Sequence, residues 1–99
     1  MFSARGMLQM SRYARPRPRK LAKKLRKIRI DLGLTQAEMV KRLRFRGVYQ
    51  GHVSEYERGV REPPYPVLLR YAKVAEISTD FLIDDTLNLP SEKQLKRAS

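Results

Sequence analysis

The sequence predicts an all-α domain preceded by a flexible basic arm. Three observations indicate this. Apolar residues recur at helical spacing in several segments, and no segment shows the alternation typical of a strand. Glycines and prolines separate these segments. Half of the 22 basic residues lie within residues 1–30, which contain no acidic residue, so the positive charge is concentrated at the N-terminus.

The composition excludes several classes of function. The 99-residue chain has a net charge of +12, and basic segments of this kind bind polyanions, either nucleic acid or an anionic membrane surface. It contains no Cys, which excludes a disulfide framework, a thiolate zinc site and a thiol nucleophile. No run approaches the roughly 18 apolar residues that a membrane span needs. Because His52 is the single histidine and no Gly-rich phosphate loop is present, we expect no enzyme, no cofactor and no metal site.

Residues 1–19 are expected to form the arm. Arginine alternates with Pro16 and Pro18, a pattern that favours extended, solvated backbone. The arm either inserts into a DNA minor groove or makes diffuse contacts with phosphates. Its expected contact residues are Arg15, Arg17, Arg19 and Lys20. An Arg-rich, acid-poor N-terminus is also typical of transit peptides, but this one runs directly into a helix without an obvious processing signal.

Two helices are expected next. The first begins near Lys20 and ends at Gly33, with one apolar stripe formed by Leu21, Leu25, Ile28 and Leu32. The second begins after Thr35, which with Glu38 has the spacing of a capping box. Its apolar face is expected to contain Met39, Val40 and Leu43.

Three further helices are expected. A third helix is expected from about Gln50 to Arg58, ending at Gly59. Pro66 suits the opening turn of a fourth helix. Ser78 or Thr79 is expected to cap a fifth. The expected aromatic core residues are Tyr56, Tyr71 and Phe81, and residues 86–99 are expected to be a polar tail.

Several motifs in order carry a resemblance to a known family. They are residues 32–38 (LGLTQAE), 53–59 (VSEYERG), 61–63 (REP) and 78–82 (STDFL). Together they resemble the phage-repressor/Cro-like (XRE-type) helix-turn-helix family. The resemblance implies a five-helix lambda-repressor-like domain, and it places the domain at residues 20–85, between the arm of residues 1–19 and the tail of residues 86–99.

The resemblance also implies the site residues. The third helix would read bases in the DNA major groove through Gln50, Gly51, His52, Ser54 and Glu55. Contacts with the DNA backbone are expected from Gln36, Arg44, Arg46, Arg58 and Arg61. Gln36 lies at a helix N-terminus, which suits phosphate binding. Arg29 and Glu57 match a pair that joins the first and third helices in relatives, so a salt bridge is expected.

Three features depart from the family pattern. Val40 stands within the second helix where relatives often carry a small residue. Arg44, Phe45 and Arg46 intervene before Gly47 as an apparent insertion, which either lengthens the second helix or enlarges the turn. Glu76 stands where relatives often carry glycine, at the end of the fourth helix.

The sequence therefore predicts site-specific binding of double-stranded DNA and regulation of transcription, in the cytoplasm and, in a prokaryote, at the nucleoid. A homodimer on a palindromic site is the usual arrangement for a single recognition helix. Two alternatives stay open. One is a protein-interaction module of the antitoxin or adaptor type that has a protein partner, and the other is a basic RNA-binding protein. No membrane association is expected.

Overall fold

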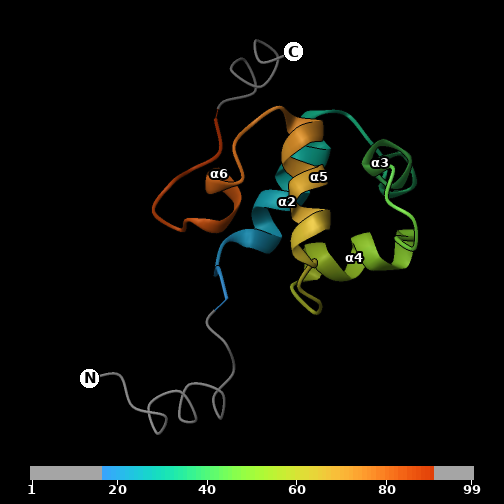
Figure 1. Ribbon diagram of the computed structural model, residues 1–99, viewed down its shortest axis with the longest axis horizontal. Coiled ribbons are helices and arrows are strands. Elements are labelled where there is room, and N and C mark those ends of the chain that lie inside the picture. The colour runs from blue at the N-terminus through green and yellow to red at the C-terminus, as the bar shows by residue number, and fades with distance from the viewer. Residues whose placement is uncertain (1–16, 91–99) are drawn as a thin grey trace, which may run out of the picture.

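The computed structural model describes residues 17–90, and they form five helices with no strand among them. The helices are α2 (Leu21–Asp31), α3 (Gln36–Leu43), α4 (Gln50–Arg58), α5 (Tyr65–Ala75) and α6 (Asp80–Ile83). Figure 1 shows α5 and α2 at the centre, with α3 and α4 on one side and α6 on the other. The predicted all-α class is confirmed. The expectations for residues 1–16 and 91–99, Arg15 included, lie outside the described residues.

Three of the four residues in the predicted stripe of the first helix form the buried face of α2, and the fourth, Leu32, follows the helix and is half-buried. Leu21, Leu25 and Ile28 are buried, because the 3.6-residue period brings them to the same side. The helix ends at Asp31, and Gly33 follows with φ of +72°, a left-handed conformation that glycine adopts without strain. The chain then turns sharply into α3.

A complete capping box opens α3. The Thr35 hydroxyl accepts from the Glu38 amide at 3.1 Å, and the Glu38 carboxylate accepts from the Thr35 amide at 2.8 Å. These two bonds satisfy amides that otherwise lack partners at a helix N-terminus, so the prediction is confirmed. The helix stops at Leu43, and Arg44 has φ of +50°. The apparent insertion therefore enlarges the turn and does not lengthen the helix.

The boundaries of α4 match the predicted ones. The helix begins at Gln50 and ends at Arg58, and Gly59 closes it with φ of +73°. At its N-terminus the Tyr49 amide donates to His52 Nδ1 at 3.0 Å, an interaction that the sequence did not suggest. Val53 and Tyr56 face the core, three residues apart on one side of the helix.

The last two helices differ from expectation in detail. α5 begins at Tyr65, one residue before Pro66. Thr79 is the N-cap residue of α6 but makes no capping bond, whereas the Ser78 hydroxyl accepts from the Asp80 amide at 3.2 Å. Phe81 was predicted in the core, but this is wrong: it is only half-buried, and its neighbour Leu82 is the fully buried residue of α6. Because α6 is about one turn long, its adjacent residues point in different directions, and the burial of Leu82 leaves Phe81 nearer the surface.

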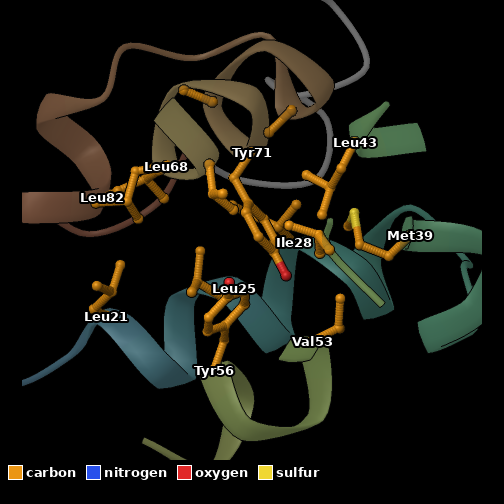
Figure 2. Close-up of a cluster of buried hydrophobic side chains, with 14 residues drawn as sticks. Leu21, Leu25, Ile28, Met39, Leu43, Val53, Tyr56, Leu68, Tyr71 and Leu82 are labelled. Carbon is orange, nitrogen blue, oxygen red and sulfur yellow. The ribbon is translucent and has the colours of Figure 1, made fainter. Parts of the chain in front are cut away.

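Side chains from all five helices meet in one core. Figure 2 shows Tyr71 extending from α5 toward α2, where Ile28 lies. Tyr56 and Tyr71 are both buried, as predicted. Leu89 packs against the same core, so the packed body continues past residue 85, the boundary expected from the sequence.

Candidate nucleic-acid interface

The candidate site is built on two helices, α3 and α4, which are joined by the turn of residues 44–49. The two helices pack against each other, and both pack on the central helices. α4 buries Val53 and Tyr56, and it exposes Gln50 and Gly51 on the other side. Among the described residues, nothing beyond the adjoining residues and the backbone of α4 itself lies within 4 Å of the position that a Cβ at Gly51 would occupy. The first turn of α4 therefore presents open, polar surface.

An ion pair joins α4 to α2. Arg29 Nε lies 2.6 Å from Glu57 Oε2, and Arg29 Nη2 lies 2.9 Å from Glu57 Oε1. Both side chains are largely buried. The third guanidinium nitrogen, Nη1, donates to the Leu34 carbonyl at 2.9 Å, so the pair also holds the turn between α2 and α3. The pair expected between Arg29 and Glu57 is thus present, and it sets the position of α4 on the body.

Gln36 belongs to the same network. Its side-chain amide donates to Glu57 Oε1 at 3.3 Å. The residue is half-buried at the first position of α3. Its expected contact with a phosphate would compete with this weak internal bond.

Three of the expected base-reading residues have internal partners. His52 uses Nδ1 as an acceptor for Tyr49, and its ring stacks against Tyr49 and Tyr56, with centroids 5.8 and 6.4 Å away. The Ser54 hydroxyl accepts a long bond from Arg58 Nε at 3.4 Å. The Glu55 carboxylate accepts from Arg61 Nε at 2.8 Å. All three residues are half-buried, in contrast to Gln50 and Gly51.

The expected backbone-contacting arginines lie at both ends of α4. Arg44 and Arg46 are exposed in the turn before it, and Arg58 and Arg61 are exposed at its end. The hydrogen bond from Arg61 lowers the pKa of Glu55, which favours the ionised pair. Glu55 therefore neutralises part of the positive charge at this end of the helix.

Residues 17–20, which we name the root of the arm, lie beside the C-terminal end of α4. Arg17 Nε is 4.0 Å from Glu62 Oε2, and the backbone amides of Arg19 and Lys20 donate to the Asp85 carboxylate. Residues 17–20 are thus attached to the body, although the sequence suggested a flexible arm up to residue 19. The side chains of Arg17, Arg19 and Lys20 stay exposed.

Comparison with known proteins places the chain in a family. A family model described as Helix-turn-helix, of the Cro/C1 (XRE) type, matches residues 25–82. The chain belongs to this helix-turn-helix family. It is also similar to the HTH-type transcriptional regulator ImmR of Bacillus subtilis (strain 168), with 33% identity over 63 residues, which cover 64% of this chain and 47% of the relative. The chain thus matches about half the length of this curated relative. No solved structure matches it.

The structure adds residues to the helix-turn-helix site that sequence reasoning missed. Tyr49 is 68% exposed directly before α4, where it adjoins the open face of Gln50 and Gly51. The one signal in the sequence that could have identified Tyr49 was its position directly before the predicted third helix. Asp85 was missed because it lies 65 residues from the arm that it contacts.

Residues 17–90 contain no cluster of three or more His, Asp or Glu side chains placed to hold a metal ion. Within the same range, every helix is too short or too polar to cross a membrane.

Proposed function

We propose that the chain binds double-stranded DNA at specific sites and regulates transcription, with α4 in the major groove. The observation that carries this proposal is the exposed polar face of Gln50 and Gly51 on α4, within a packed helix-turn-helix pair. Exposed arginines at both ends of the helix suit the two flanking phosphate backbones. The similarity to a protein described as a transcriptional regulator supports the same function.

Base reading is proposed to centre on Gln50. A glutamine side chain pairs with adenine through two hydrogen bonds in the major groove. Gly51 lets the helix approach the bases closely, because it presents no side chain. Arg61 occupies only Oε1 of Glu55, so Oε2 stays available to accept from cytosine while the other guanidinium nitrogens of Arg61 contact a phosphate.

His52 and Ser54 are proposed to read bases in a more restricted way. His52 Nδ1 is occupied by the Tyr49 amide, which leaves Nε2 as the polar atom available to a base. The long bond from Arg58 to Ser54 is readily exchanged for a contact with DNA. Arg58 would then move to the backbone.

Backbone contacts are proposed on both sides of α4. The N-terminus of α3 offers amides and a favourable dipole beside Gln36, while Arg44 and Arg46 reach the phosphates before α4. The arm cations add phosphate or minor-groove contacts. If the arm neutralises about five phosphates, the slope of log K against log salt becomes more negative by about 4–5.

A selection from random duplex DNA at near-physiological salt tests the proposal. An enriched motif is expected. Gln50→Ala should relax this motif at one position, whereas Arg17→Ala should weaken binding to every sequence by a similar factor. These two variants control for each other, because one removes a base contact and the other a backbone contact. Salt-sensitive binding without any motif would contradict site-specific recognition.

A homodimer on a palindromic motif, a protein partner, and the cytoplasmic location remain predictions. Sedimentation of the chain with and without its selected duplex measures the number of copies per site. The alternative function is a protein-interaction module of the antitoxin or adaptor type. It predicts that no motif is enriched, and that the Gln50→Ala variant captures a defined protein partner as efficiently as the unaltered chain does.

A further inference from the structure

The carboxylate of Asp85 holds the root of the basic arm. Its Oδ2 accepts from the Arg19 amide at 2.8 Å, and its Oδ1 accepts from the Lys20 amide at 3.1 Å. Both oxygens are therefore used, and both partners are backbone groups. Because the donors are backbone amides, the attachment leaves the cationic side chains of these residues exposed.

The segment that carries Asp85 is itself tied down. Residues 84–89, which we name the strap, follow α6 and run back along α2. Lys24 Nζ donates to the Asp84 carbonyl at 2.9 Å, and only 6% of Lys24 is exposed. Leu89 packs against the core at the other end of the strap. Asp85 is thus presented from a segment with an attachment on each side.

Arg17, the first residue of the root, lies near the C-terminal end of α4. Arg17 lies 4.0 Å from Glu62 and lines an open concave surface together with Glu55, Val60 and Arg61. In Figure 1 the chain leaves α2 on the lower side of the body, where α4 also lies. Arg17 therefore lies beside the candidate interface.

We propose that Asp85 is a positioning residue that holds Arg17 beside the DNA segment next to the C-terminal end of α4. This inference rests on the proposed function. Attachment of the backbone at Arg19 and Lys20 raises the effective concentration of the Arg17 side chain at that DNA segment, because an unattached backbone would let this side chain sample a larger volume. Asp85 contributes in this way without touching DNA.

The direction in which Asp85→Asn changes the affinity for DNA distinguishes a positioning role of Asp85 from a simple effect of its charge. Asp85→Asn removes a negative charge from a protein that binds a polyanion, which by charge alone strengthens binding. Loss of the attachment weakens it. Asp80→Asn is the matched control, because this exposed carboxylate on α6 has the same charge and makes no hydrogen bond or ion pair among the described residues.

The decisive measurement is a double-mutant cycle on the selected duplex. Asp85→Asn should weaken binding at least about threefold, and Asp80→Asn should leave it unchanged or slightly tighter. Arg17→Ala should cost less affinity in the Asp85→Asn background than in the unaltered chain, since the released arm no longer places Arg17. Additive effects, or equal tightening by both Asn variants, would overturn the proposal.

A measurement without DNA keeps this test separate from the proposed function. The chain has no cysteine, so a spin label on Val60→Cys reports distance from one defined, exposed position. It should broaden the NMR signal of the Arg17 amide, and Asp85→Asn should remove most of this broadening while Asp80→Asn preserves it. Unchanged broadening in Asp85→Asn would overturn the attachment. Failure of the unaltered chain to bind any duplex would instead contradict the proposed function.

Discussion

Arg29 and Glu57 join α2 to α4 by two hydrogen bonds, from Nε to Oε2 at 2.6 Å and from Nη2 to Oε1 at 2.9 Å. The exposed fractions of the two side chains are 12% and 4%, so neither charge is well solvated. Such a bidentate pair specifies orientation as well as contact, because a planar guanidinium matches a carboxylate in one geometry. The pair therefore fixes how the outward face of α4 is presented.

Glu57→Gln should lower the free energy of unfolding by about 3 kcal/mol, since it leaves the Arg29 charge buried without a counter-charge. Urea denaturation measures this loss. The double variant Arg29→Met with Glu57→Met should recover much of it, because no charge then stays buried. Glu55→Gln is the control: its pair with Arg61 is more exposed and should contribute less. Equal losses in Glu57→Gln and Glu55→Gln would contradict the structural role of Arg29 and Glu57.

Tyr71→Phe should leave the protein as stable as before or raise its free energy of unfolding by up to about 1 kcal/mol. The Tyr71 hydroxyl is fully buried and has no hydrogen-bond partner among the described residues, so its removal abolishes a desolvation cost. Thermal and urea unfolding at neutral pH check this. A marked destabilisation would show that the hydroxyl has a partner in solution, such as a buried water.

The same residue predicts a loss of stability in alkali. Burial raises the pKa of Tyr71 well above its usual range, mainly through desolvation of the phenolate. The unfolded chain ionises this phenol near its ordinary pKa of about 10, whereas the folded chain holds the proton. The stabilisation is thus present below that pH and decreases as the pH rises beyond it. The decrease between pH 9 and pH 11 should be smaller in Tyr71→Phe, as urea denaturation at each pH would measure; equal decreases would contradict the assignment.

Glu76→Gly should raise the free energy of unfolding by about 0.5–1 kcal/mol. Glu76 ends α5 with φ of +57°, a left-handed conformation that is unfavourable for a residue with a Cβ. Gly33→Ala is the reverse experiment at φ of +72°, where no neighbouring atom would be met, and it should destabilise through backbone strain alone. A shift of melting temperature in the same direction for both variants would refute the explanation.

Gly51→Ala separates stability from recognition. Gly51 lies inside α4 in open space, so alanine should stabilise the helix by about 1 kcal/mol. If α4 lies in the major groove, the added methyl group should at the same time change the affinity for the selected duplex or the preferred bases. Thermal unfolding and repeated selection measure the two effects. A stabilised variant with unchanged affinity and motif would place Gly51 away from the bases.

Local signals explain why the helices that carry the candidate site were predictable. Thr35 and Glu38 interact over three residues, and Gly59 ends α4 through its own backbone conformation, so both boundaries follow from short segments. The Arg29–Glu57 pair was implied by the family resemblance, because spacing alone does not identify partners in two different helices. The internal contacts of His52 and Glu55 were not expected, since they depend on the rotamers that the folded helix selects.

By itself, the sequence determined the helical class, the start of α3, the boundaries of α4, most of the buried stripe and the concentration of positive charge near the N-terminus. These features follow from periodicity, capping and composition, which act over a few residues. Only the tertiary structure decided that Phe81 stays outside the core, that Arg44 to Arg46 enlarge a turn, and that Asp85 holds the arm. Those outcomes depend on which distant surfaces meet when the core closes around Tyr71, and no local pattern encodes contacts across 65 residues.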